Sequence, residues 1–183
     1  MSLVTWHSKA MQLVNDSDPI LRQQVINNFN FAGDVDPEQL SRDMAPIMFE
    51  NGGIGLAAPQ VGLSYRMFLM GDPKEAIACF NPRILSTSEE LIYDVEGCLT
   101  FPGLFLRIGR PKEVVAEFYD TNGKFQTMTF TDIMARCFCH ELEHLNGVLY
   151  TDKVAKLTLQ MAKQKQRKLL RKLHRKVKRG RQN

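Results

Sequence analysis

Two histidines and a glutamate stand close together in the segment 139–147, which reads Cys-His-Glu-Leu-Glu-His-Leu-Asn-Gly. If this segment is helical, each residue advances about 100° around the axis, so His140 and His144 lie one above the other on one face. Two imidazoles one turn apart can bind a single metal ion, and Glu141 beside them can take a proton from a water molecule at that ion. The pattern therefore indicates a metal-dependent hydrolase, although a half-buried helix that happens to carry two histidines would have the same spacing.

Two histidines do not complete such a site, because a catalytic zinc-like centre needs three protein ligands and one open position. The candidates for the third ligand are several carboxylates and the cysteines Cys98, Cys137 and Cys139. Cys139 should point about 100° away from His140 and miss the ion. Cys137 faces the same way as His140, whereas Cys98 belongs to a glycine-flanked loop that can place its thiolate freely. Geometry therefore leaves both Cys98 and Cys137 as candidates for the third ligand, with a modest preference for Cys98.

Three helices are expected to position or accompany these residues. The first should begin with Asp36 as N-cap and Pro37 as first helical residue, and should end at 51–53, Asn-Gly-Gly. The second should carry both histidines over 131–147, and the last should cover about 153–177.

Short strands should surround the histidine-containing helix. They are expected at 65–70, 77–80 and 83–86, and alternation over 113–129 predicts a hairpin that turns at 120–123. Loops are expected in two stretches rich in glycine and small residues, 53–62 and 95–103. The predicted fold class is α+β, with short, mostly antiparallel sheets packed around a central His-Glu-x-x-His helix and a basic C-terminal helix.

The composition is typical of a soluble globular protein, with 44% hydrophobic and 24% charged residues. No apolar run is long enough to cross a bilayer. Residues 1–10 lack the apolar stretch of a secretory signal and do not resemble an organelle transit peptide, so a cytoplasmic protein without a membrane partner is expected. The spacing of the four cysteines does not suggest a disulfide scaffold.

Charge is distributed unevenly along the chain. Of the 24 Lys and Arg residues, 13 lie after Asp152, where there is no Asp or Glu; the other 11 share the first 152 residues with all 20 acidic residues, a net charge of −9. The sequence thus predicts a catalytic domain over 1–152 and a basic C-terminal helix or tail over 153–183. Such a tail favours a polyanionic partner.

Three segments together resemble the peptide deformylase family, metallohydrolases that remove the formyl group from N-formylmethionyl peptides. The family motifs are Gly-x-Gly-Leu-Ala-Ala-x-Gln, Glu-Gly-Cys-Leu-Ser and His-Glu-x-Asp-His. The chain has, in the same order, Gly-Ile-Gly-Leu-Ala-Ala-Pro-Gln at 53–60, Glu-Gly-Cys-Leu-Thr at 96–100 and His-Glu-Leu-Glu-His at 140–144. This resemblance covers roughly 18–152.

The resemblance implies roles for particular residues. Cys98, His140 and His144 would hold one divalent ion, Fe(II) as is typical of the family, with Zn(II), Ni(II) or Co(II) also suited to this donor set. Glu141 would accept the proton of the attacking water and pass it to the leaving amine. The Gln60 side-chain amide and the backbone N–H of Leu99 would donate to the oxyanion.

The substrate would be an N-formylmethionyl peptide that lies extended along the backbone of Gly53 to Gly55, as an added strand. The candidate residues around the peptide and its methionine side chain, besides His140, are Gly53, Ile54, Gly55, Gly97, Phe105, Ile133 and Cys137. The basic C-terminal helix would dock on ribosomal RNA, as in similar bacterial deformylases, and truncation after Asp152 should abolish that binding without loss of activity on short peptides.

The sequence departs from the family pattern at three positions. Thr100 stands where Ser is usual, Glu143 where Asp is usual, and Cys139 where Gln is common. Glu143 is expected to be a solvated surface charge rather than a partner of Arg110. The alternatives left open are a His-Glu-x-x-His metallopeptidase, a basic RNA- or ribosome-binding module with a structural metal site, and a cysteine hydrolase that uses Cys98.

Overall fold

The computed structural model describes residues 11–180; the side chains of residues 174 and 176–180 are not included in that description. Residues 1–10, in which no targeting signal was found, and the last three residues of the basic tail lie outside it.

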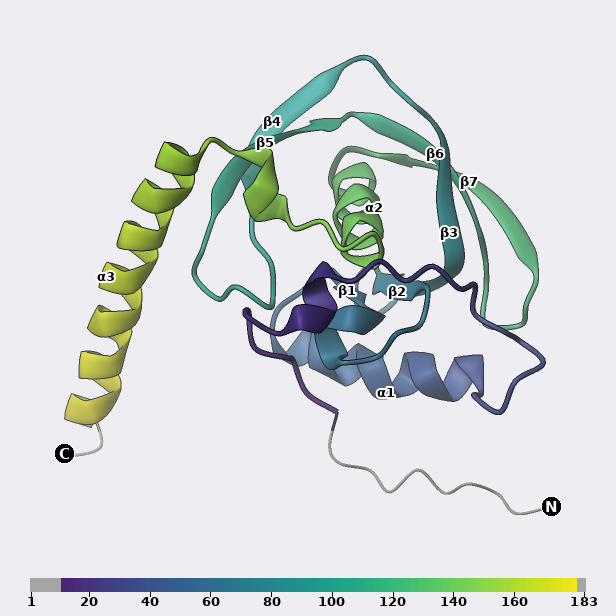
Figure 1. Cartoon of the computed structure of the whole chain (residues 1–183), viewed down its shortest axis with the longest axis horizontal. Helices are drawn as coiled ribbons and strands as arrows, with labels where there is room; N and C mark the ends of the chain where they lie inside the picture. The colour runs from purple at the N-terminus through teal and green to yellow at the C-terminus, as the bar shows by residue number, and fades with distance from the viewer. Residues whose placement is uncertain (1–10, 181–183) are drawn as a thin grey trace.

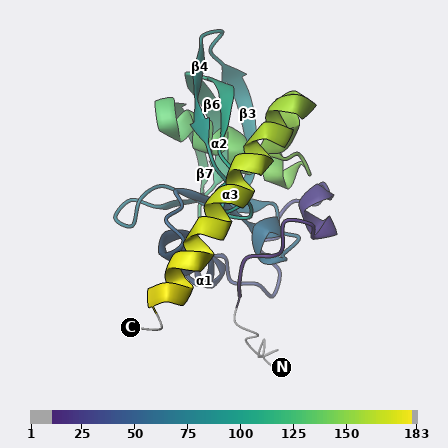
Figure 2. The ribbon, with the colours of Figure 1, turned by 90° about the vertical axis from the view of Figure 1, so that its left-hand side faces the viewer.

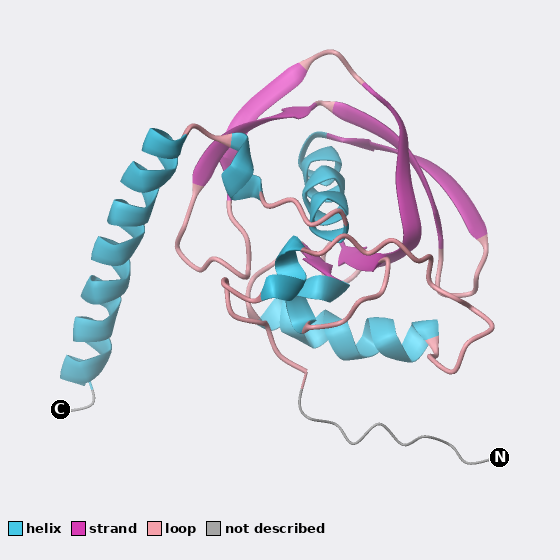
Figure 3. Ribbon diagram, in the orientation of Figure 1, coloured by secondary structure: helices cyan, strands magenta, loops and turns pink. Residues whose placement is uncertain are grey.

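Within residues 11–180, seven strands form two antiparallel sheets (Figures 1 and 3). The larger sheet has the order β1-β2-β3-β6-β7 and the smaller one pairs β4 with β5. The strands are β1 (Gly55–Ala57), β2 (Met67–Met70), β3 (Ile77–Thr87), β4 (Leu91–Glu96), β5 (Leu106–Pro111), β6 (Glu113–Tyr119) and β7 (Phe125–Thr131).

The described part of the chain also contains three α-helices and three short 3-10 helices. They are α1 (Pro37–Glu50), α2 (Asp132–Leu145), α3 (Lys156–Gly180), η1 (Pro19–Arg22), η2 (Ala58–Val61) and η3 (Tyr150–Lys153). Figure 1 shows β3 to β7 arching over α2, with β1, β2 and α1 on the opposite side of it and α3 standing at the edge of the molecule. The predicted α+β class, with α2 at its centre, is confirmed.

Helix α2 is held in place by an aromatic cluster between it and the larger sheet. The ring of Phe138 on α2 packs edge-on against Phe68 of β2 and stacks on Phe130 of β7, with centroid distances of 5.1 and 5.3 Å. Buried aromatic pairs of this kind contribute both area and geometric preference. They fix α2 so that the opposite side, with His140 and His144, turns toward the loop after β4.

Helix α1 forms as its sequence predicts. The Asp36 side chain caps it by accepting from the N–H of Glu38 at 2.9 Å, and Pro37 follows in the first turn. After Glu50 the chain reverses at Gly52, whose φ of 70° is accessible to glycine at little cost. Leu40, Met44 and Met48 are buried against the back of β1 and β2.

Several sequence-based boundaries were wrong. The segment 53–62 is not an irregular loop, because it contains β1 and η2, and β4 and β5 were not predicted at all. The expected strands 77–80 and 83–86 form one strand, β3, with a register shift between Phe80 and Arg83 where Asn81 has a φ of 51°. The C-terminal helix begins at Lys156, after η3, rather than at 153.

Helix α3 contacts the body along one side (Figure 2). Leu159 and Ala162 pack against the cluster around Leu104 and Tyr150, and the Gln166 side chain donates to the carbonyl oxygen of Pro102 at 2.9 Å. Leu169 and Leu170 reach Gly103 in the same loop. The contacts of α3 therefore lie between Leu159 and Leu170; further along, Leu173 is 48% exposed, and the side chain of Val177 lies outside the described residues.

Candidate active site

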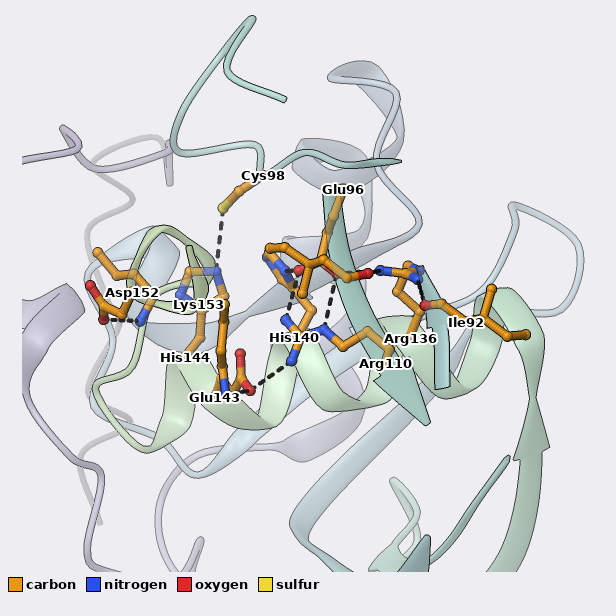
Figure 4. Close-up of polar contacts among 12 residues, drawn as sticks. Ile92, Glu96, Cys98, Arg110, Arg136, His140, Glu143, His144, Asp152 and Lys153 are labelled. Carbon is orange, nitrogen blue, oxygen red and sulfur yellow. Dashed lines mark hydrogen bonds and ion pairs between the residues drawn. The ribbon is translucent and has the colours of Figure 1, made fainter. Parts of the chain in front are cut away.

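The fold brings Cys98, His140 and His144 together. One candidate donor atom from each lies within 4.8 Å of the other two, and Cys98 Sγ is 3.3 Å from His144 Nε2. Cys98 reaches α2 from the loop just after β4, as Figure 4 shows. Cys137, the other candidate third ligand, is not part of this group.

This donor set fits a divalent metal ion. Bond lengths of about 2.3 Å to sulfur and about 2.0–2.1 Å to nitrogen, at a tetrahedral angle, place such ligands about 3.5 Å apart. The observed 3.3 Å between Cys98 Sγ and His144 Nε2 is close to that value. Nδ1 of His140 faces Glu96, which leaves its Nε2 as the ligand atom, and a carboxylate behind a ligating imidazole is the usual arrangement in metal sites.

Glu96 is the centre of a buried network of charges behind His140 (Figure 4). Its carboxylate lies 2.6 Å from His140 Nδ1, accepts from Arg110 at 2.7 and 3.0 Å, and accepts from Arg136 at 3.0 Å. Burial alone would raise the pKa of Glu96, but the hydrogen bonds from His140 and Arg110 hold it well below its usual range. The carboxylate is therefore charged, and it fixes the orientation of the His140 ring.

Glu143 extends this network, so the expectation of a solvated surface charge was wrong. Its Oε1 lies 2.6 Å from Arg110 and 2.6 Å from Lys153, and its side chain is only 17% exposed. Residues Glu96, Arg110, Glu143 and Lys153 thus form a chain of ion pairs from the back of His140 to the end of η3 (Figure 4). Arg110 has two carboxylates, which offset the cost of its burial.

Glu141 faces a cavity beside Cys98, His140 and His144, which we call the metal-ligand group. It is 3% exposed, and its Oε2 has no hydrogen-bond partner among the described residues. Burial raises the pKa of Glu141 to about 7, while the positive charge of His140 acts in the other direction. A carboxylate with such a pKa can both accept and release a proton near neutral pH.

Gly55 leaves room for this carboxylate. A Cβ atom at Gly55 would lie 2.6 Å from Cys137 Sγ and 2.8 Å from Glu141 Cδ, closer than carbon can approach either. A Cβ atom at Gly53 would lie 2.6 Å from the Leu99 side chain. A side chain at Gly55 would therefore displace Cys137 and Glu141, whereas one at Gly53 would require the Leu99 side chain to shift; these contacts place the Gly53–Gly55 backbone against α2 and the 97–105 loop.

The Gln60 side chain is held at both ends. Its Oε1 accepts from the N–H of Ala57 at 2.8 Å, while its Nε2 donates to Thr100 Oγ1 at 3.2 Å and lies 3.4 Å from Cys98 Sγ. The bond from Ala57 fixes which end of the amide carries the donors. A Gln60 N–H is thereby directed toward the metal-ligand group.

A cavity of about 480 Å³ connects these residues. All seven residues expected around the peptide line it: Gly53, Ile54, Gly55, Gly97, Phe105, Ile133 and Cys137. Gln60, Cys98, Leu99, His140 and Glu141 also face it, whereas His144 is not among its lining residues. Burial raises the pKa of Cys137 well above its usual value, so this wall of the cavity is an uncharged thiol.

The sequence analysis missed the buried charged residues that lie behind His140. Glu96, Arg110 and Arg136 are each less than 9% exposed and were not proposed as parts of the site. Glu96 offered a signal, since it stands in the same short motif as Cys98. Arg110 and Arg136 offered none, because a buried arginine looks like a surface arginine in sequence.

A thiolate and two imidazoles able to hold a divalent ion, beside a buried carboxylate with a raised pKa and a large cavity, define a metal-dependent hydrolase. The model of the polypeptide deformylase family matches residues 10–160. The chain therefore belongs to the polypeptide deformylase family.

Known relatives agree with this assignment. The chain is 44% identical over 149 residues to a peptide deformylase of Finegoldia magna, with 80% of this chain and 91% of the relative covered. The crystal structure of a peptide deformylase from Legionella pneumophila superposes with a TM-score of 0.79 at 33% identity, over 90% of this chain and 97% of the other. One from Thermotoga maritima gives a TM-score of 0.75 at 34% identity, over 81% and 99%.

Proposed function

We propose that the cavity beside α2 is where this hydrolase removes the N-formyl group from N-formylmethionyl nascent peptides and releases formate. The observation that carries the proposal is the position of Glu141. Its buried carboxylate, with a pKa raised to about 7, faces the same cavity as Cys98 and His140. Family membership favours this function over the metallopeptidase, RNA-binding and cysteine-hydrolase alternatives.

The enzyme is metal-dependent, and in our proposal Cys98, His140 and His144 hold one Fe(II) ion, with Zn(II), Ni(II) and Co(II) as substitutes. When bound, the ion supplies a Lewis acid that lowers the pKa of water and polarises the formyl carbonyl. Glu96 keeps the His140 ring in the ligating orientation through the contact at Nδ1.

Glu141 takes the proton of the attacking water and passes it to the leaving amine, so that hydrolysis of the amide bond yields formate and a free N-terminus. The developing oxyanion is stabilised by the Gln60 side-chain amide and the Leu99 backbone N–H. Gln60 suits this role because its amide is already oriented by Ala57 and Thr100 and needs little rearrangement.

The peptide lies along the Gly53–Gly55 backbone, and the methionine side chain enters the apolar part of the cavity. Ile54, Ile133, Cys137 and His140 form its walls, and Gly97 and Phe105 also line the cavity. An uncharged thiol at Cys137 suits a thioether side chain, since neither group requires a hydrogen-bond partner.

Outside the cavity, we propose residues 1–152 as the catalytic domain and the basic segment 153–183 as a ribosome-binding helix. The support is the charge of α3, whose Lys and Arg side chains, where described, are exposed. Among the described residues, no helix has both the length and the apolar character needed to cross a membrane. A cytoplasmic location stays a prediction.

The decisive experiment measures formate release from N-formyl-Met-Ala-Ser by the purified full chain. Activity should disappear on treatment with a chelator and return when Fe(II) is added under anaerobic conditions. N-acetyl-Met-Ala-Ser serves as a control, because an acetyl group is larger and less electrophilic than a formyl group. Formate release that is independent of metal, or cleavage at internal peptide bonds, would contradict the proposal.

A further inference from the structure

The smaller sheet exposes apolar side chains on its outer face. Leu91, Tyr93 and Val95 alternate along β4 and are 50%, 61% and 60% exposed. Of the residues between them, Ile92 is half-buried and Asp94 is exposed, and Glu96 at the end of the strand joins the buried charge network. A row of large exposed apolar residues is unusual for a surface in contact with water and often marks a binding site.

The partner strand makes this face flat. Tyr93 stands opposite Gly109, Leu91 opposite Pro111 and Val95 opposite Arg107. A Cβ atom at Gly109 would lie 2.9 Å from the Tyr93 ring, so the ring lies across β5. Leu91, Tyr93 and Val95 together, which we call the β4 stripe, therefore form an apolar surface that continues onto Gly109 and Pro111 and borders the exposed Arg107.

The β4 stripe begins at the active-site cavity. Val95 lines the cavity, and so does Phe105, which is 60% exposed at the start of β5. Ile54 and Ile133 stand on the rim, at 42% and 55% exposure. From Val95 the strand leads away from the 97–105 loop to the edge of the molecule (Figure 1). Val95 and Leu91 are four residues apart, which is about 13 Å in an extended strand.

We propose that the β4 stripe binds the residues of the substrate peptide that follow the cavity, and that it favours apolar side chains there. This inference rests on the proposed function, because it takes the cavity as the site of the formylated N-terminus. An extended peptide rises about 3.3 Å per residue, so 13 Å accommodates roughly four residues, about the third to the sixth. The occupant is the substrate because the stripe and the cavity share Val95.

The test compares three substrates: N-formyl-Met-Ala, a formylated heptapeptide with Leu at positions 3–6, and the same heptapeptide with Ser at those positions. With the native chain, kcat/KM for the Leu peptide should exceed that for the Ser peptide about tenfold, mainly through KM. In the double variant Leu91→Ser/Tyr93→Ser the two peptides should become equal, whereas the dipeptide, too short to reach Tyr93, is turned over as before. Ile26→Ser is the matched control, since Ile26 is 80% exposed and does not line the cavity.

The outcomes separate this inference from the function on which it rests. A Leu preference that is absent in the native chain, or that persists in the double variant, overturns it. An equal loss on the dipeptide also overturns it, because Leu91 and Tyr93 would then support the fold. A dimer in sedimentation that depends on these residues, without any Leu preference, would assign the stripe to a second copy of the chain. Failure of the proposed function looks different: no formate is released even from the dipeptide.

Discussion

Helices α2 and α3 both carry charged side chains, but most of those on α2 are buried and those described on α3 are exposed. Nine of the 14 residues of α2 are buried, among them Arg136, His140, Glu141 and His144. In α3, none of the residues with a described side chain is buried. Burial ties Arg136 and His140 on α2 to the carboxylate of Glu96, and it raises the pKa of Glu141. Exposure leaves the charges of α3 free to act together on a distant polyanion. If this contrast is correct, substitutions on α2 and its partners should alter turnover or metal binding. Substitutions on α3 should alter only the association with a polyanion.

The largest effect should come from Glu141→Gln. The amide keeps the shape of the side chain but cannot accept the proton, so kcat should fall by about 10²–10⁴ while bound metal is unchanged. Formate release and elemental analysis on the same sample measure both. The control is Glu89→Gln, an exposed acid away from the cavity. Near-native turnover in Glu141→Gln would show that Glu141 is not the proton carrier.

Cys98→Ser should weaken metal binding by more than the ~10–100-fold that changes behind the ligands usually cost. The hydroxyl is a poor ligand for the borderline-soft ions that a thiolate favours. Competition with a chromophoric chelator gives the affinity. Cys137→Ser serves as comparison, because Cys137 lines the cavity without belonging to the metal-ligand group. If that variant lost the metal and Cys98→Ser kept it, the ligand assignment would be reversed.

Glu96→Gln tests whether the buried charged residues of α2 depend on one particular partner, the carboxylate of Glu96. Removing one carboxylate from His140, Arg110 and Arg136 should lower metal affinity by about 10–100-fold and stability by ~3–5 kcal/mol. Chelator competition and denaturant unfolding of the metal-free protein separate the two effects. Glu143→Gln should cost less of both, since Glu143 reaches His140 only through Arg110 and Glu96 and is partly exposed. Equal losses in the two variants would show that the network acts as one unit.

Neutralising α3 should change association alone. The variant Lys163→Gln/Arg167→Gln/Arg171→Gln removes three exposed cations but keeps the contacts of Gln166, Leu169 and Leu170 with the 102–103 loop. Binding to ribosomes should weaken, and the dependence of log affinity on log salt should become shallower by about two to three units, while dipeptide turnover is unchanged. Truncation after Asp152 is a less clean test than the sequence suggested, because it also removes those contacts with a wall of the cavity. Salt-independent binding would refute the electrostatic role.

The smallest effect concerns Asp152, which joins η3 to the N-terminal segment. A hydrogen bond from Arg22 lowers the pKa of Asp152 in the folded chain. The pair therefore stabilises the fold above the unfolded pKa of about 4, and this contribution is lost as pH falls through the lower folded value. Because both side chains are largely exposed, it should not exceed ~0.5 kcal/mol. Asp152→Asn should lower Tm slightly at pH 7 and not at pH 2.5; an equal difference at both would point to the cap on Leu149 instead.

The sequence predicted the parts of the molecule in which local pattern and function agree. Asp36 and Pro37 predict the start of α1, and the spacing of His140 and His144 predicts which face of α2 carries the site. Strand β4 was missed because its pattern is inverted: Glu96 points inward, and Leu91, Tyr93 and Val95 are exposed. Pattern rules expect the reverse. In β5 Leu106 and Ile108 alternate inward in the usual way, but the charged Arg110 takes the next inward position. Their inward charges are stable only because the partners come from distant segments, which no local window contains.

The contact of Gly55 with Cys137 and Glu141 has a consequence for how such enzymes can diverge. A side chain at position 55 would meet both Glu141 and Cys137 Sγ, and a smaller residue at 137 would relieve only the second contact. Shortening Glu141 would remove the proposed proton carrier. Substitutions at 55 should therefore be rejected both singly and in pairs with 137, and a library that randomises both positions together should recover only glycine at 55 among active variants.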